Sequence, residues 1–210
     1  MKFIIFHGSF GSPEINWYIP LKEELASFGQ EVWIPRLPVN TWDEITMVGP
    51  ESTESTQNLD SWFSSFDANI PNAFKEGELC FVGHSIGCLF ILHLLERYNI
   101  KLDSAIFVSP FLNKLNKSWQ IDLVNESFYK SDFDFEKINK LVDISYSLYS
   151  DNDPYVDIND SLEFIEKTES LPILVRGGEH MNDESGFQSF PLVEELCKTR
   201  FGYSSQSIIL

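Results

Sequence analysis

The stretch Leu79–Gly87 constrains the fold of this chain more than any other. Four apolar residues, Leu-Cys-Phe-Val, are followed by Gly-His-Ser-Ile-Gly and then by an apolar run of helical length from Cys88 to Leu95. This order predicts a buried strand, a sharp turn and a buried helix. Glycines flank such a turn because a side chain would clash where the strand and helix backbones approach each other.

A serine at a strand-to-helix turn of this kind holds its hydroxyl at a strained, exposed corner. Ser85 is therefore the candidate nucleophile. The alternative interpretation is a serine at a tight turn with no chemical role. G-x-S-x-G alone is a short motif that also occurs by chance, so the flanking strand and helix are what favour the catalytic interpretation.

Composition indicates a globular protein with an acidic surface. The chain has 210 residues, of which 43% are hydrophobic and 14% aromatic, enough for a single domain over residues 1–210 with a substantial core. With 32 acidic against 15 basic residues the formal net charge is -17. Phosphate backbones and anionic lipids would be repelled, so we expect neither nucleic acid nor membrane as a partner.

Several features predict a cytoplasmic protein. The apolar run at residues 3–6 is too short for the core of a signal peptide, and no stretch approaches the roughly 20 apolar residues that cross a bilayer. The three cysteines, Cys80, Cys88 and Cys197, are odd in number and lie in expected strands or helices. They are typical of reduced thiols rather than of a disulfide framework.

Strand and helix patterns alternate along the chain. We expect an α/β fold in which a parallel sheet is covered on both faces and the functional loops gather at the carboxyl ends of the strands. Ser12 and Pro13 are expected to begin the first helix, which Pro20 interrupts. The expected strands are residues 3–6, 31–35, 79–82, 104–108, 144–149 and 172–175, and the expected helices are residues 15–28, 59–74, 88–95, 157–168 and 185–197.

Three segments lack a clear pattern. Residues 36–58 are irregular, and the polar stretch 49–56 is expected to be an exposed connection. Residues 111–141 are aromatic and loosely periodic, which fits either a short lid-like insertion over a pocket or ordinary packing helices at the edge of the sheet. The tail 201–210 could not be placed.

A serine nucleophile needs a histidine as its base. In α/β hydrolases the serine precedes the acid and the acid precedes the histidine, which excludes His7 and His84. His93 falls within the helix that follows Ser85, where a hydrogen-bonded core histidine is expected. His180 remains, in a glycine-flanked loop after the last expected strand.

The acid is expected at the end of the preceding strand, where Asp151 and Asp153 both qualify. Asp153 is preferred because Pro154 stiffens its turn, and Asp151 is then a capping or turn residue. Asp157 is expected to cap the next helix. Backbone N–H groups should stabilise the oxyanion.

One of those N–H groups is expected from Ile86, directly after the nucleophile. The other should come from the loop after the first strand, at Ser9 in preference to Phe10. His7 is expected to shape that loop rather than to take part in the chemistry.

Four blocks of the sequence together resemble a known group: His7–Ser12, Gly83–Gly87, Asp153–Val156 and Gly178–His180. They resemble the compact serine hydrolases of the α/β-hydrolase superfamily, in particular the group of retinoblastoma-binding protein 9 and the YdeN-like hydrolases. Asn16-Trp17 fits the same group. The resemblance implies a three-layer α/β-hydrolase fold with a minimal six-stranded parallel sheet, and a triad of Ser85, Asp153 and His180.

The expected activity is hydrolysis of a carboxylic ester in a small-molecule acyl substrate through an acyl-enzyme, with no metal and no cofactor. Amide or thioester hydrolysis and acyl transfer use the same groups. The alternative is a catalytically weak or inactive binding protein on a hydrolase scaffold. A flavodoxin-like nucleotide binder is disfavoured because the first loop lacks G-x-G-x-x-G and G-K-[ST].

Overall fold

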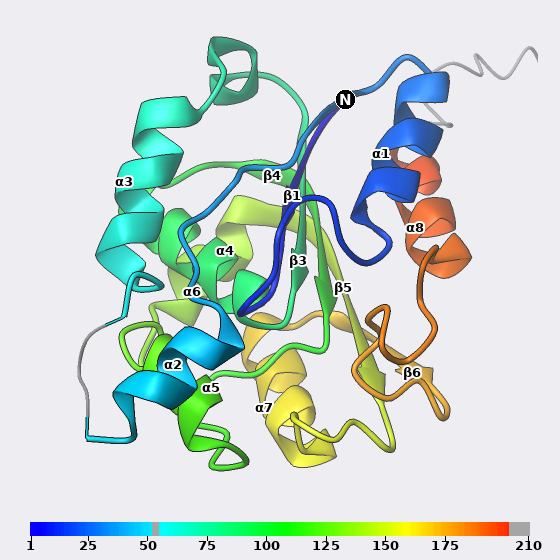
Figure 1. The fold of residues 1–210 in the computed structure, drawn as a ribbon. Coiled ribbons are helices and arrows are strands. Elements are labelled where there is room, and N and C mark those ends of the chain that lie inside the picture. The colour runs from blue at the N-terminus through cyan, green and yellow to red at the C-terminus, as the bar shows by residue number, and fades with distance from the viewer. Residues whose placement is uncertain (52–54, 202–210) are drawn as a thin grey trace, which may run out of the picture.

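The computed structural model describes residues 1–51 and 55–201, which contain a six-stranded sheet whose neighbouring strands are all parallel (Figure 1). This confirms the predicted α/β architecture. Strand order reverses between β1 and β3, so the loops that follow these two strands diverge and leave a crevice at their carboxyl ends. In spatial order the strands are β2 (Glu31–Trp33), β1 (Lys2–Phe6), β3 (Leu79–His84), β4 (Leu102–Val108), β5 (Val142–Ser150) and β6 (Leu171–Val175).

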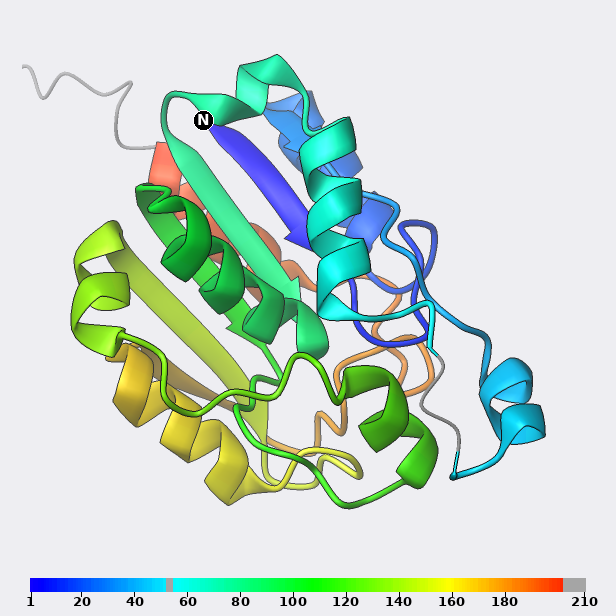
Figure 2. The same ribbon diagram turned by 90° about the vertical axis from the view of Figure 1, so that its left-hand side faces the viewer.

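Helices cover both faces of the sheet and make three layers (Figures 1 and 2). Because successive side chains of a strand point to opposite faces, Phe3 and Ile5 join one apolar cluster while Ile4 and Phe6 join the other. Helices α1 (Tyr18–Ser27) and α8 (Pro191–Phe201) pack on the first face. The second face is covered by α3 (Leu59–Asn69), α4 (Ile86–Tyr98), α6 (Phe135–Leu141) and α7 (Ile158–Thr168).

Two short helices lie beyond the carboxyl ends of the strands. They are α2 (Trp42–Val48), which projects from the body of the molecule in Figure 2, and α5 (Trp119–Asn125). Helix α2 was not among the helices expected from the sequence. Its start is marked by a capping box in which Thr41 Oγ1 accepts from the Glu44 N–H and Glu44 Oε2 accepts from the Thr41 N–H.

The predicted start of the first helix was wrong. Asn16 has a positive φ of 59°, which no α-helix accommodates, so α1 begins only at Tyr18. Ser12 accepts a hydrogen bond from the Glu14 N–H in a local turn instead of capping a helix. Pro20 lies in the first turn of α1, where its missing N–H costs no helical hydrogen bond.

Two other helix boundaries also differ from the prediction. The helix expected over 59–74 ends at Asn69, and after Pro71 a separate 3-10 turn, η1 (Asn72–Lys75), follows. The last helix begins at Pro191 rather than near Ser185. Ser185 is held in a turn by Asn182, whose side-chain oxygen accepts from the Ser185 N–H, and this local bond competes with helix formation.

Other predictions are confirmed by the described residues. Asp157 caps α7 by accepting from the Asn159 N–H. His93 is a buried histidine whose Nε2 donates to the Phe128 carbonyl at 2.8 Å, and burial lowers its pKa. All three cysteines are buried and unpaired.

Two segments lie outside the residues that the structure describes. Residues 52–54 of the expected exposed connection and residues 202–210 of the tail lie outside the described residues. In the part of the chain that is described, no helix has the length and apolar character that crossing a membrane requires.

Candidate active site

Ser85 lies at a strained turn between β3 and α4. Its φ of 56° and ψ of −123° are unfavourable for a residue with a side chain. The turn is fixed because the Ser85 N–H donates to the Val108 carbonyl at 2.8 Å. The close approach requires glycine at position 87, where a Cβ atom would lie 2.5 Å from the Phe6 carbonyl oxygen. The predicted strand, sharp turn and helix are thus all present around Ser85.

His180 and Asp153 form a buried pair. His180 Nδ1 lies 2.9 Å from Asp153 Oδ2 and 3.1 Å from Oδ1, and only 2% of the aspartate side chain is exposed. Burial alone would raise the pKa of Asp153, but hydrogen bonds from His180 and from the N–H groups of Tyr155 and Val156 hold it below its ordinary value. The ionised carboxylate can only accept, so His180 Nδ1 carries a proton, and in the neutral ring the lone pair lies on Nε2.

The two residues before Asp153 hold the loop that carries His180. Asp151 Oδ1 accepts from the Gly177 N–H at 2.8 Å, and Asn152 Oδ1 accepts from the Glu179 N–H at 2.9 Å. The structure therefore brings Asp153, and not Asp151, to the imidazole ring. Asp151 has the turn role that the sequence suggested as its alternative.

His84 contributes to the site in a way that the sequence analysis missed. A carbonyl oxygen can only accept, so His84 Nε2 donates to the His180 carbonyl at 2.9 Å, and Nδ1 accepts from the Tyr18 hydroxyl at 2.9 Å. Burial, reinforced by His180, lowers the pKa of His84 to about 3. A permanently neutral His84 thus ties the backbone of His180 to the serine turn. The only sequence signal was its position beside Ser85.

His7 helps to hold the loop after β1. Its Nδ1 donates to the Gly8 carbonyl at 2.9 Å and its Nε2 accepts from the Leu37 N–H at 3.3 Å. Burial lowers the pKa of His7 to about 4, so the ring is neutral at physiological pH. This arrangement agrees with the expected role of shaping the loop.

Ser85 and His180 line one cavity of about 280 Å³ at the carboxyl ends of the strands. Its apolar wall comes from four parts of the chain that are distant in sequence, namely the loop after β1, α2, the segment around α5 and the loop after β5. The polar rim includes Asn182, Asp183 and Glu184. The apolar wall consists of Phe10, Ile15, Trp42, Leu115, Ile121 and Tyr155.

The two N–H groups expected to meet an oxyanion remain available. Among the described residues, neither the Ile86 N–H nor the Ser9 N–H has an intramolecular hydrogen-bond partner, whereas the Phe10 N–H donates to Gln57 Oε1 at 3.3 Å. Ser9 lines the cavity. Among the described residues, those of the cavity included, no group of three or more His, Cys, Asp or Glu side chains is arranged to hold a metal ion.

The sheet order, the serine turn after β3 and the Asp–His pair after β5 and β6 define an α/β hydrolase. Comparison with protein families narrows this class. The family model for serine hydrolases matches residues 3–199, so the chain belongs to the serine hydrolase family.

Relatives support this assignment along nearly the whole chain. YdeN of Bacillus subtilis (strain 168) is 24% identical over 199 residues, which are 94% of each protein. The crystal structure of the B. subtilis ydeN gene product superposes with a TM-score of 0.79 over 96% of this chain and 98% of that one, at 24% identity. Est1E from Butyrivibrio proteoclasticus has a TM-score of 0.65 at 16% identity, covering 94% and 86% of the two chains.

Proposed function

We propose that this serine hydrolase cleaves a carboxylic ester through an acyl-enzyme. Ser85 attacks the ester carbonyl, His180 takes the serine proton and delivers it to the leaving alcohol, and Asp153 orients His180. Water then attacks the acyl-enzyme with His180 as base, the bond from Ser85 Oγ to the acyl carbon breaks, and His180 returns the proton to Ser85 as the carboxylic acid leaves. The N–H groups of Ile86 and Ser9 stabilise the oxyanion in both steps.

The observation that carries the proposal is the entry of three distant loops into one cavity. A strained serine and a histidine that is hydrogen-bonded to a buried carboxylate line the same space. The proton on His180 Nδ1 leaves Nε2 as the acceptor that a serine hydroxyl requires. A serine with no chemical role would not require the strained backbone of Ser85. A surface histidine would not require a buried carboxylate that fixes its tautomer.

The cavity supports a small to medium acyl group as substrate. Its volume of about 280 Å³ lies just below the usual range for ligand sites, roughly 300 to 1,000 Å³. Its apolar wall suits an alkyl or aryl chain, and no lysine or arginine among the described residues lines the cavity. An acyl chain that carries a carboxylate or phosphate is therefore disfavoured by Asp183 and Glu184.

Turnover of p-nitrophenyl esters from acetate to octanoate tests the proposal. Wild-type protein should hydrolyse the shorter esters, and Ser85→Ala should lower kcat by about 10³-fold or more at unchanged thermal stability. Ser64→Ala is the matched control because Ser64 is exposed on α3, remote from the cavity lining. Equal hydrolysis by Ser85→Ala would rule out Ser85 as the nucleophile. No hydrolysis of any ester by the wild-type protein would favour a binding protein on a hydrolase scaffold.

A further inference from the structure

A buried polar network lies directly behind the loop that carries Ser9. Gln57 and Asn125 are each only 1% exposed, and they come from the segment before α3 and from the last residue of α5. Ser9 Oγ donates to Asn125 Oδ1 at 2.6 Å, and Gln57 Nε2 donates to the same oxygen at 2.8 Å. Burial of two amides is costly unless their polar atoms are paired.

The orientation of both amides follows from one backbone group. The Phe10 N–H can only donate, so Gln57 must present its oxygen Oε1 to it. Gln57 Nε2 then faces Asn125, which must present its own oxygen in turn. That oxygen leaves the Ser9 hydroxyl no role except donor. The network therefore has one consistent arrangement, and it fixes both Ser9 and Phe10.

This arrangement uses one of the two backbone N–H groups and leaves the other without a partner. The Phe10 N–H is turned toward Gln57, while the Ser9 N–H is without an intramolecular partner among the described residues. Phe10 also has a positive φ of 56°, a conformation that persists only where surrounding contacts hold it. The amides of Gln57 and Asn125 supply such contacts on either side of the Ser9–Phe10 peptide.

The network is itself anchored at both ends. Asn40 Oδ1 accepts from the backbone N–H groups of Thr56 and Gln57, which fixes the approach to α3. On the other side, the segment that ends in Asn125 also supplies Leu115 and Ile121 to the cavity wall. Any movement of α5 away from the cavity would break the bonds to Ser9 and Gln57.

We propose that Asn125, with Gln57, is a positioning residue that holds the Ser9 N–H in the oxyanion hole. It follows that the α5 part of the 111–141 segment is a fixed part of the catalytic machinery rather than a lid that opens. The inference rests on the proposed esterase function, since it assigns a role in the stabilisation of that reaction's oxyanion.

Kinetics of Asn125→Ala, Ser9→Ala and the double variant test the inference. Loss of one oxyanion donor costs about 10²- to 10³-fold in kcat, so a misplaced donor should lower kcat by roughly 10- to 100-fold. KM should stay within about threefold, because ground-state binding does not use the oxyanion contact. Ser9→Ala keeps the backbone N–H but removes its anchor, so it should lose a similar factor.

The double variant distinguishes a loss of kcat that acts through the Ser9 hydroxyl from a loss caused by a wider disturbance of the structure. If Asn125 acts through the Ser9 hydroxyl, the double variant should be no slower than the slower single variant. A trifluoromethyl ketone, which forms a tetrahedral oxyanion on the serine, should bind more weakly by the same factor as kcat/KM falls. Asn113→Ala is the matched control within the same segment, since Asn113 bonds Glu163 away from the cavity.

Three outcomes would overturn the inference. They are a kcat within twofold of wild type in Asn125→Ala, losses that multiply in the double variant, and an unchanged kcat in Ser9→Ala. The last result decides the matter even if Asn125→Ala does not fold. Failure of the proposed function would look different, because wild-type protein would then be inactive or as active as Ser85→Ala.

Discussion

Asp151, Asn152 and Asp153 are consecutive polar residues with three different partners on one loop. They bond the Gly177 N–H, the Glu179 N–H and the His180 ring in turn. The sequence favoured Asp153 because the next residue, Pro154, stiffens the turn, and this signal can be read from adjacent residues. Asn152 carried no comparable signal, because its partner is set by how the loop after β6 folds back over β5.

Replacement of each aspartate by asparagine should separate the two roles. Asp153→Asn should lower kcat by about 10³- to 10⁴-fold, because an amide neither holds the required tautomer of His180 nor stabilises the imidazolium. Asp151→Asn should stay within about twofold, since the amide oxygen still accepts from the Gly177 N–H. Steady-state kinetics with a short-chain ester measure both. A larger loss in Asp151→Asn would reverse the assignment.

The types and order of the residues predicted the candidate catalytic residues, but they did not predict the residues that hold these in place. Ser85, Asp153 and His180 were found because each stands at the end of an expected strand in a specific order. Tyr18, Gln57 and Asn125 are ordinary polar residues in the sequence. Their contacts depend on which helices and loops meet in space, and no local pattern encodes that.

The strands at the centre of the sheet were predictable because β1 and the start of β3 are short, buried apolar runs. The boundaries of the helices were harder to predict from the sequence. The positive φ at Asn16 delays the start of α1. The hydrogen bond from the Ser185 N–H to the Asn182 side chain competes with helix formation and delays the start of α8. Helix α2 could have been found, since Thr-Trp-Asp-Glu is a capping-box sequence.

Helix α2 is expected to set preference for the acyl chain. Trp42 lines the cavity and contacts the Phe10 ring at a centroid distance of 5.3 Å. Trp42→Ala should raise KM for a hexanoate ester by about fivefold, because roughly 1 kcal/mol of apolar contact is lost. KM for acetate should change little. Measurement of KM across an ester series checks this.

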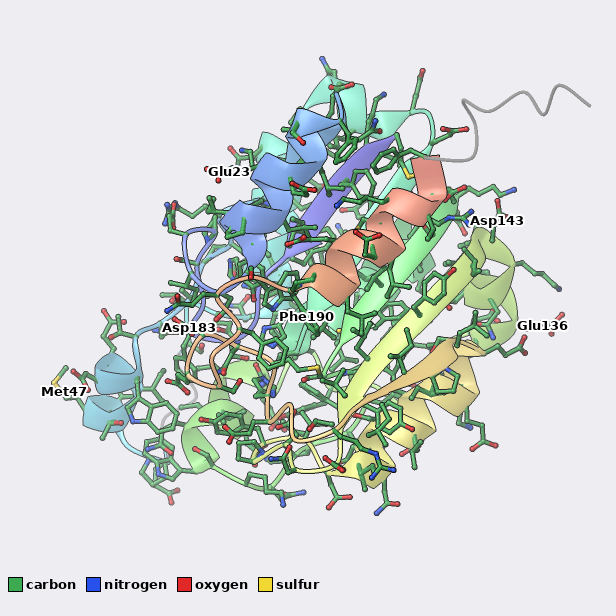
Figure 3. All side chains as sticks on the ribbon, turned by 90° about the vertical axis from the view of Figure 1, so that its right-hand side faces the viewer. Glu23, Met47, Glu136, Asp143, Asp183 and Phe190 are labelled. Carbon is green, nitrogen blue, oxygen red and sulfur yellow. The ribbon has the colours of Figure 1, made fainter. Side chains whose placement is uncertain are left out.

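Met47 provides the control on the same helix. It is 79% exposed and projects from the tip of α2, well apart from Asp183 in the loop before α8 (Figure 3). Met47→Ala should leave KM unchanged for every chain length. Equal changes in KM for acetate and hexanoate in Trp42→Ala would contradict a role in chain-length selection.

At the scale of the whole molecule, buried neutral histidines make stability depend on pH. The pKa values of His84 and His7 fall from 6.5 to about 3 and about 4 on folding. Between these values and 6.5 the unfolded chain binds more protons than the native one. The stabilisation is therefore complete above pH 6.5 and is lost as pH falls toward 3.

Replacement of one of these histidines should flatten the acid side of the stability profile. Each fully depressed histidine steepens the fall in unfolding free energy by up to about 1.4 kcal/mol per pH unit. His84→Gln removes one titrating group, so its unfolding free energy should vary less between pH 6.5 and 4 than that of the wild-type protein. Urea unfolding at several pH values measures the slope. Identical slopes would show that His84 is not held neutral.

Covalent labelling by a fluorophosphonate tests whether Ser85 is an activated nucleophile. We expect one adduct per chain, located on Ser85 by peptide mass spectrometry, and much slower labelling of His180→Ala. A wild-type protein that stays unlabelled, or an adduct on another residue, would contradict this expectation.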